Sequence, residues 1–340
     1  MKVVTTVGID LAKNSFEIVG VDENQHVVWR KRLKRSQVAE FFENLPRCKV
    51  AMEACGGSHF WGRVFRGQGH EVRIIAAQFV KPFVKSQKND RNDELEIVEA
   101  SLRPSMNFVA VKEVWQQDLQ CLHRVRERVQ AQRVQITNQI RSLLLESGIA
   151  IGEGVTEFKR DLPLILETPD NGISEILRQL VHDLYMDLKS LDQRKLKLDA
   201  QLENLASQSE ECKRLMSVPG VGPLISTAFV AAIGDPGTFK NGRQVGAWLG
   251  LVPRQHSSGD RQVLSGITKR GDIYLRALLT HGARAVVAHS KRKPTKKTLY
   301  EWVSQLEARR GTNRTTIALA NRNARVMWAL LKDKTMYKVA

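Results

Sequence analysis

The chain has 340 residues, and its 53 Lys and Arg residues against 36 Asp and Glu residues give a formal net charge of +17. This length is enough for two or three domains that each bury a hydrophobic core. A hydrophobic content of 42% is close to the globular average and argues against a disordered or fibrous protein. The positive charge indicates a polyanionic partner, either nucleic acid or an anionic membrane surface.

Charge is unevenly distributed along the sequence. Residues 1–100 contain 16 basic and 13 acidic residues, and residues 101–211 contain 14 and 17. Residues 212–340 contain 23 basic and 6 acidic residues, a net charge of +17. The whole excess therefore belongs to the last third of the chain, as expected for a domain that lies against phosphates.

Several classes of protein are disfavoured. No apolar stretch approaches the roughly 20 residues that cross a bilayer, and the first residues lack the apolar segment of a signal peptide. The four cysteines form no Cys-x-x-Cys pair and have no histidine at zinc-site spacing. We therefore expect reduced thiols, a soluble cytoplasmic protein and no membrane partner.

The first 110 residues show three strand-like runs followed by alternating helices and strands. The expected strands are residues 3–9, 15–21, 26–33, 49–55 and 72–76, and the expected helices are residues 37–45 and 59–66. This order is typical of the ribonuclease H-like fold, in which a mixed sheet carries acids at adjacent strand ends. We therefore predict an α/β metal-binding domain over residues 1–110.

Four acids occupy the positions where such a fold brings carboxylates together. Asp10 ends the first predicted strand and Glu53 ends the fourth, and these strands are neighbours in this topology. Asp90 and Asp93 open the next helical stretch, three residues apart and hence on one face. Converging carboxylates repel one another unless cations neutralise them, and oxygen ligands suit Mg²⁺ or Mn²⁺.

Two such ions about 4 Å apart can activate a nucleophile and stabilise the leaving oxygen of a phosphodiester. Any one of these acids alone is explained as a turn residue, a surface acid or an acid at a helix N-terminus. All four together favour a metal site, with Asp10, Glu53, Asp90 and Asp93 as its ligands.

A strand that ends in Gly8-Ile9-Asp10 also opens sugar kinases and related ATPases. Their phosphate-binding hairpin usually carries Gly and Thr after the Asp, whereas residues 11–14 here are Leu-Ala-Lys-Asn. No second phosphate loop follows, so the kinase alternative has low weight.

The middle of the chain, residues 111–211, contains two amphipathic patterns. Leu, Val and Ile recur every three or four residues over 114–147 and again over 173–205, which predicts two helices of more than 30 residues. Residues 148–171, with Pro163 and Pro169, are the expected connection. The two helices would form a long antiparallel coiled-coil arm that acts as a spacer or joins subunits, since a lone helical hairpin buries little surface.

The basic region, residues 212–340, is predicted to be mainly helical. Gly220 and Gly222 form a G-x-G turn between two helical runs. Such a turn exposes backbone N–H groups at a helix N-terminus, as helix-hairpin-helix modules do when they bind a DNA phosphate. A plain tight loop is the alternative, and the basic surroundings favour the phosphate.

A Ser257-Ser258-Gly259 loop follows, close in sequence to four cations: Arg254, Arg261, Lys269 and Arg270. The loop is either a flexible linker or the carrier of a hydroxyl nucleophile, with the cations stabilising charge on an attacked phosphate. Composition alone favours the linker.

Taken together and in order, the motifs closely resemble those of the DEDD-type insertion-sequence transposases, a family described as bridge-RNA-guided DNA recombinases. The resemblance runs from about residue 5 to 290 and favours the nucleophile over the linker. The motifs that carry it are Gly8-Ile9-Asp10, the strand ending at Glu53, Asp90-x-x-Asp93, Pro219-Gly220-Val221-Gly222, Leu249 to Pro253, Ser257-Ser258-Gly259, and Ile267-x-Lys269-x-Gly271-Asp272.

The resemblance implies roles for these residues. The four acids match the Mg²⁺-binding quartet of the family's RuvC-like domain, which residues 1–110 would form. Ser258, which precedes Gly259, matches the serine that forms a covalent phosphoserine link to DNA. Ser257 remains the alternative nucleophile. The resemblance also implies a structured element-encoded RNA that pairs with donor and target DNA. The family acts as a dimer of dimers in which the serine of one subunit lies beside the acids of another.

We therefore expect a nucleoid-associated bacterial transposase that works as a homodimer or homotetramer. The basic residues Lys291, Arg292, Lys293, Lys296, Lys297, Arg309 and Arg310 are predicted to lie on RNA or DNA backbone. Two alternatives stay open. One is a RuvC-like junction nuclease that uses water as nucleophile, and the other is a non-catalytic nucleic-acid-binding protein.

Overall fold

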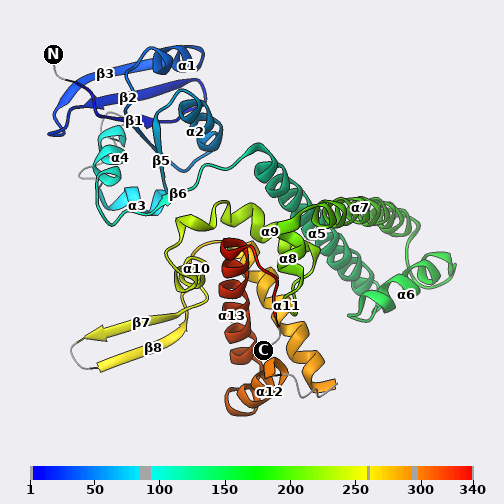
Figure 1. Cartoon of the computed structure of the whole chain (residues 1–340). Coiled ribbons are helices and arrows are strands. Elements are labelled where there is room, and N and C mark those ends of the chain that lie inside the picture. The colour runs from blue at the N-terminus through cyan, green and yellow to red at the C-terminus, as the bar shows by residue number, and fades with distance from the viewer. Residues whose placement is uncertain (1–2, 84–92, 259–260, 293–297, 339–340) are drawn as a thin grey trace. The chain divides into compact units, whose positions relative to one another are not determined.

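The computed structural model describes residues 3–83, 93–258, 261–292 and 298–338, and the chain divides into two compact units (Figure 1). Unit 1 consists of Met1–Gln117 with Ile233–Asn241, and unit 2 of Asp118–Ala232 with Gly242–Ala340. The arm and the basic region therefore belong to one unit. The division into domains 1–110, 111–211 and 212–340 stays a prediction about their separate roles.

Unit 1 is built on a six-stranded mixed sheet with the order β3-β2-β1-β4-β5-β6. Its strand β1 pairs antiparallel with β2 and parallel with β4, so the predicted adjacency of the first and fourth strands is confirmed. The two-residue β6 adds an edge strand that the sequence did not predict. The bounds are β1 Thr6–Asp10, β2 Ser15–Val21, β3 Val27–Lys34, β4 Lys49–Glu53, β5 Glu71–Ile75 and β6 Phe108–Val109.

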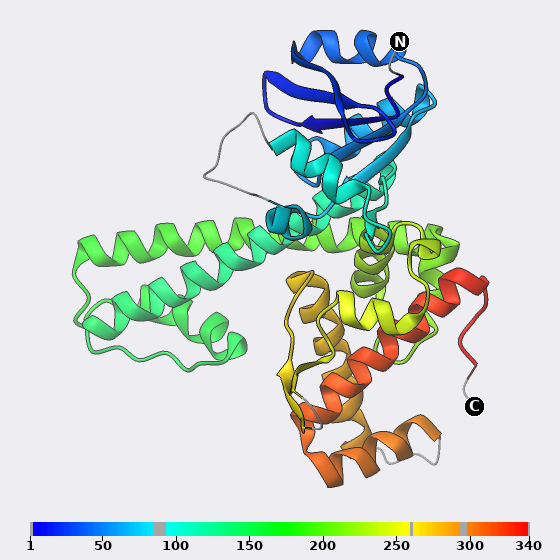
Figure 2. The same cartoon turned by 90° about the vertical axis from the view of Figure 1, so that its left-hand side faces the viewer.

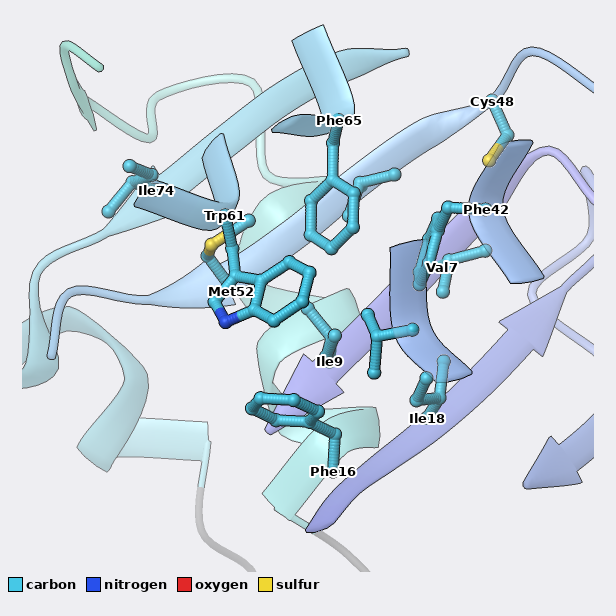
Figure 3. Close-up of a cluster of buried hydrophobic side chains, with 12 residues drawn as sticks. Val7, Ile9, Phe16, Ile18, Phe42, Cys48, Met52, Trp61, Phe65 and Ile74 are labelled. Carbon is cyan, nitrogen blue, oxygen red and sulfur yellow. The ribbon is translucent and has the colours of Figure 1, made fainter. Parts of the chain in front are cut away.

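Helices α1 (Arg35–Glu43) and α2 (Ser58–Gly67) cover one face of this sheet. Aromatic rings fill the space between, with Phe42 and Phe65 at 4.3 Å between centroids and Phe16 edge-on to Trp61 (Figure 3). Lys34 is the N-cap of α1, so this helix begins two residues before the expected start at residue 37. This closed aromatic core holds β1 and β4 rigidly in register.

The opposite face is covered by α3 (Ala77–Val80), the 3₁₀ turn η1 (Lys81–Phe83) and α4 (Asp93–Ser101). Helix α4 lies directly on β1 at Gly8. A Cβ atom there would be only 2.3 Å from the carbonyl oxygen of Glu94 and 2.6 Å from Val98 Cγ2. Gly8 is thus required by the close approach of a helix, and α4 is the element that faces Asp10.

Unit 2 contains α7 (Glu175–Gln208) and all but the first four residues of α5 (Val114–Glu146), and these two long helices lie side by side (Figure 2). They run antiparallel, as predicted, because Arg126 pairs with Asp199 while Arg133 pairs with Asp192. The coiled-coil character of this arm and its role in oligomerisation stay predictions.

Residues 148–171 are more than the expected connection, since they contain the helix α6 (Val155–Glu167). Its side chains Phe158 and Leu162 are buried against Ile140 and Leu144 of α5 and against residues of α7. This apolar packing outweighs the helix-breaking tendency of Pro163, which lies inside α6.

The rest of unit 2 is helical apart from one β-hairpin, and no helix in the described part of the chain is long and apolar enough to cross a membrane. Helix α13 is a core element, with ten of its residues buried. The remaining elements are α8 Glu210–Met216, α9 Pro223–Ile233, η2 Pro236–Thr238 (a part of unit 1), α10 Gly242–Trp248, β7 Pro253–Ser258, β8 Arg261–Ile267, α11 Ile273–Arg292, α12 Thr298–Arg310 and α13 Thr312–Asp333.

Candidate metal centre and serine hairpin

Strand pairing brings Asp10 and Glu53 together. Ile9 of β1 lies opposite Met52 of β4, so Asp10 and Glu53 follow at adjacent strand ends. Side chains alternate along a strand, and Gly8 contacts α4 while Ala51 packs in the cluster that contains Ile97 of α4. Asp10 and Glu53, each two residues further on, therefore face the α4 side of the sheet.

The predicted pair on the helix is only partly within the described structure. Asp93 is the first residue of α4 and is half-buried, whereas Asp90 lies outside the described residues. Within the described ranges, no three His, Cys, Asp or Glu side chains are close enough to hold a metal ion among themselves. The assignment of Asp10, Glu53, Asp90 and Asp93 as ligands thus stays a prediction.

The pKa values of two neighbouring groups are shifted by the negative charge of the carboxylates at the ends of β1 and β4. The pKa of the Cys55 thiol is raised by burial and by the charges of Glu53 and Asp10. The pKa of Glu94 is raised by burial and, more weakly, by Glu17 and Asp10, while a hydrogen bond from its own backbone and the charge of Arg30 oppose the shift. In addition, Glu94 Oε2 is buried without a hydrogen-bond partner among the described residues. Crowded carboxylate oxygens, one of them unsatisfied, are a donor set that fits a hard divalent cation.

The expected serine loop is instead a β-hairpin of β7 and β8 (Figure 1). Ser257 and Ser258 end β7, and Ser258 lies opposite Arg261, the first residue of β8. Gly259 lies outside the described residues. The signal for a hairpin was present, because a two-residue gap that begins with Gly is typical of tight hairpins. It was missed because neither strand has a buried face: all of β7 is exposed.

The two serines point to opposite faces of this hairpin. Ser258 shares its face with His256, two residues earlier on β7, and with Arg261 across the ladder. Arg254 alternates with them along β7 and lies where the pairing with β8 shifts register, between Pro253 and Gln255. Ser257 lies on the other face, where its Oγ accepts a hydrogen bond of 2.9 Å from Gln255 Nε2. The cation directly across the ladder, Arg261, therefore accompanies Ser258 and not Ser257.

Two glycines with positive φ fix the base of the hairpin, Gly250 at 69° and Gly271 at 78°. A Cβ on Gly250 would be 2.3 Å from Arg270 O, and one on Gly271 would be 1.8 Å from Trp248 O. Arg276 of α11 adds hydrogen bonds to the carbonyls of Leu249 (3.0 Å) and Arg270 (2.9 Å).

Two backbone hydrogen bonds add to these contacts at Gly250 and Gly271, and we call the whole set the backbone interlock of the hairpin base. Thr268 N donates to Val252 O at 2.9 Å, and Lys269 N donates to Gly250 O at 3.1 Å. The side chains of Lys269 and Arg270 are exposed on this fixed backbone. The base of the hairpin thus presents two cations at defined positions.

Packing within the chain explains why one position of the G-x-G turn is a glycine. Gly220 has φ of 83°, and a Cβ there would be 2.7 Å from the carbonyl of Gly282 in α11. Gly222, by contrast, faces open space before α9. Gly220 is therefore needed to pack the turn on α11, and a phosphate contact through Gly220 or Gly222 stays a prediction.

A buried histidine near the hairpin base was not found from the sequence. His123 of α5 is 3% exposed, with Nδ1 3.0 Å from Tyr274 Oη and Nε2 3.0 Å from Thr227 Oγ1. Because Thr227 donates its own proton to Pro223 O, it accepts one from His123. Burial and the charge of Arg126 lower the pKa of His123 to about 4, so His123 is a neutral link between α5, α9 and α11.

Comparisons with known proteins identify the family. A model described as a transposase of the DEDD type found in IS110 elements matches residues 7–148, and one described as the IS116/IS110/IS902 transposase family matches residues 212–301. A probable family 20 transposase of Pseudomonas aeruginosa is 45% identical over 98% of both chains. The transposase of insertion sequence IS1111A from Coxiella burnetii is 44% identical over 99% of this chain and 92% of its own.

The chain belongs to the IS110 family of insertion-sequence transposases. The predicted resemblance is thereby confirmed. A transposase cleaves and rejoins DNA strands and so binds DNA, and a DEDD nuclease domain implies a divalent metal. The mixed sheet of unit 1 is the ribonuclease H-like DEDD domain of this family, and a largely helical region follows it.

Proposed function

We propose that this transposase cuts and rejoins DNA with Ser258 as nucleophile, beside Mg²⁺ or Mn²⁺ held by Asp10, Glu53, Asp90 and Asp93. The observation that carries the proposal is the hairpin face that Ser258 shares with Arg261 across the ladder, with Arg254 four residues before Ser258 on the same strand. A serine flanked by cations on an exposed ribbon is suited to attack a phosphate that those cations bind.

In the proposed reaction, Ser258 Oγ forms a bond to phosphorus while the bond from phosphorus to the 3′-oxygen breaks. The serine proton passes to solvent and the released 3′-oxygen takes up a proton, so the covalent link conserves the bond for rejoining. The divalent cation would supply Lewis-acid stabilisation of charge on the phosphate and the leaving oxygen. Arg254 and Arg261 would orient the phosphate through charge-assisted hydrogen bonds.

The choice of Ser258 over Ser257 rests on the direction of the side chains. Ser257 faces away from Arg261, and its Oγ already accepts the hydrogen bond from Gln255. A hydroxyl on that face would attack without Arg261 on the phosphate. Further phosphate contacts are assigned to Lys269 and Arg270 at the hairpin base and to the backbone at Gly220 and Gly222.

We assign an RNA guide and a homodimer or homotetramer as the working assembly. Exposed apolar side chains on the arm support self-association, since water is a poor environment for so many of them. The net charge of +17 after residue 211 supports an extensive nucleic-acid-binding surface, which an RNA and DNA would share. The exposed apolar arm residues include Val134, Leu145, Ile176, Leu180 and Leu196.

The test compares Ser258→Ala with Ser257→Ala in a covalent-adduct assay on element-end DNA. Ser258→Ala should abolish the protein–DNA adduct with DNA affinity unchanged, and Ser257→Ala should retain it. Adducts that survive in Ser258→Ala but vanish in Ser257→Ala would reverse the assignment. Cleavage that leaves free ends in the double mutant would favour the water-using junction nuclease, in which the acids act without the serine.

A further inference from the structure

Glu94 is a buried carboxylate that the predicted quartet does not include. It is the second residue of α4, next to Asp93, and is 3% exposed. Its Oε1 accepts a hydrogen bond of 3.1 Å from Arg30 Nη1 of β3. Its Oε2 has no hydrogen-bond partner in the part of the chain that the structure describes.

This arrangement is unfavourable as it stands. A buried carboxylate normally has all its oxygens paired, because an unpaired one loses water and gains nothing in return. The charges of Asp10 and Glu17 act on Glu94 and add repulsion. A hydrogen bond from the backbone of Glu94 itself and the charge of Arg30 counter this repulsion, and the side chain of Arg30 is 39% exposed, which weakens its effect.

We propose that Glu94 is a fifth carboxylate of the metal centre, with Oε2 accepting a hydrogen bond from a water bound to the divalent cation. Mg²⁺ usually keeps several of its waters in protein sites, and such waters need acceptors. Partners of this kind orient the primary ligands and typically account for 10- to 100-fold in metal affinity. The inference rests on the metal centre of the proposed function and not on Ser258.

The position of Glu94 gives this contact a structural effect. The Glu94 carbonyl lies against Gly8 of β1, two residues before Asp10, and Asp93 is its neighbour in α4. A cation that draws Oε2 toward Asp10 therefore also holds the start of α4 against the end of β1. Glu94 is in this sense a positioning residue for Asp93.

The experiment uses the full-length chain with Glu94→Gln, which keeps the shape and leaves an oxygen to accept from Arg30. Mn²⁺ binding is followed by electron paramagnetic resonance, and thermal unfolding is measured with and without Mn²⁺. Affinity for Mn²⁺ should fall about tenfold or more. Without the cation, the melting temperature of Glu94→Gln should equal or exceed that of the unmodified protein, because the variant removes a buried charge beside Asp10 and Glu17.

Matched variants separate the outcomes. Glu99→Gln removes an acid of the same helix that pairs with Arg103 at 2.7 Å, and it should bind Mn²⁺ as the unmodified protein does. Arg30→Gln, which removes the cation that pairs with Glu94, should enlarge the Mn²⁺-induced rise in melting temperature. This second variant keeps the inference testable if Glu94→Gln folds poorly.

A lower melting temperature for Glu94→Gln both with and without Mn²⁺, at unchanged affinity, would make Glu94 a purely structural partner of Arg30 and overturn the inference. Asp10→Asn distinguishes this from failure of the metal centre itself. Loss of binding in Asp10→Asn alone would reject only the role of Glu94, whereas unchanged binding in both variants would reject the whole centre.

Discussion

The acid edge of unit 1, where Asp10 and Glu53 end neighbouring strands beside Asp93, and the serine hairpin of unit 2 are held in place in different ways. Asp10, Glu53 and Asp93 come from distant parts of the sequence and are placed by a sheet with a closed core on one face and α4 on the other. The hairpin has exposed strands, and its position depends on the backbone interlock around Gly250 and Gly271. Geometry at the acids is thus a property of the core, while geometry at the serine is a property of a few close backbone approaches.

The largest expected effect is on the hairpin. Gly271→Ala should destabilise unit 2 by more than about 3 kcal/mol, because the new Cβ would collide with Trp248 O and the backbone has positive φ. Adduct formation should disappear in parallel. Chemical denaturation measures the first effect and the adduct assay the second.

Gly266→Ala, in β8, is the matched control, since nothing lies within 4 Å of its Cβ position. It should leave both quantities close to those of the unmodified protein. Equal damage in the two variants would show that the interlock is not what fixes the serine.

A smaller effect is expected at the acid edge. Gly8→Ala should cost about 2 kcal/mol, since α4 must move away from β1 to accommodate the methyl group. Mn²⁺ affinity should fall with it, as Asp93 moves with α4. Gly67→Ala, at a position with open space in the last turn of α2, should change neither the unfolding free energy nor Mn²⁺ binding.

The pH dependence of stability should show the buried histidine. The pKa of His123 is lowered from 6.5 to about 4 in the folded chain, so the unfolded state takes up the proton first as pH falls. The stabilisation is fully present above 6.5 and disappears progressively toward pH 4. It amounts to about 2 kcal/mol between about pH 7 and pH 5.

His123→Gln should reduce this dependence when unfolding is followed across the same pH range. His59 in unit 1 has a pKa that is also lowered to about 4, by burial and by the nearby Lys112 and Arg63, and serves as the comparison. A pH dependence that is unchanged in His123→Gln and absent from a His59 variant would place the effect in unit 1.

The smallest effect concerns surface charge. Arg309→Gln with Arg310→Gln, in the last turn of α12, should leave stability nearly unchanged. The slope of log affinity against log salt should become less steep by about 0.9 for each phosphate that the variant no longer neutralises. Deleting residues 291–340 would be a poor substitute, because α13 is part of the core of unit 2. An unchanged slope in the double variant would assign the nucleic-acid contacts to other cations.

Sequence patterns predicted what local periodicity and strand order determine. The adjacency of Asp10 and Glu53 followed from the order of strands, and the antiparallel pair α5 and α7 followed from apolar spacing. Helix α6 was missed because Pro163 and Pro169 indicate a loop, whereas packing against α5 and α7 decides its structure.

The remaining features depend on partners far away in the sequence. The bond between Arg30 and Glu94 spans 64 residues, and the bond between His123 and Tyr274 spans 151. Apolar periodicity places each of these residues in its strand or helix and contains no information about its partner. Short strands with two exposed faces, such as β7, likewise leave no alternating pattern to detect.

The length of α5 determines the distance over which the arm extends. At 1.5 Å per residue, its 33 residues extend about 50 Å, which equals the rise of about fifteen base pairs of DNA. The ion pairs of Arg126 and Arg133 with α7 lock the register of the two helices. Removing one matched heptad from α5 and α7 would therefore shorten the arm by about 10 Å, or roughly three base-pair steps. The length of the arm is thus set by the number of residues in its two helices, and the two Arg–Asp pairs fix how those helices are aligned.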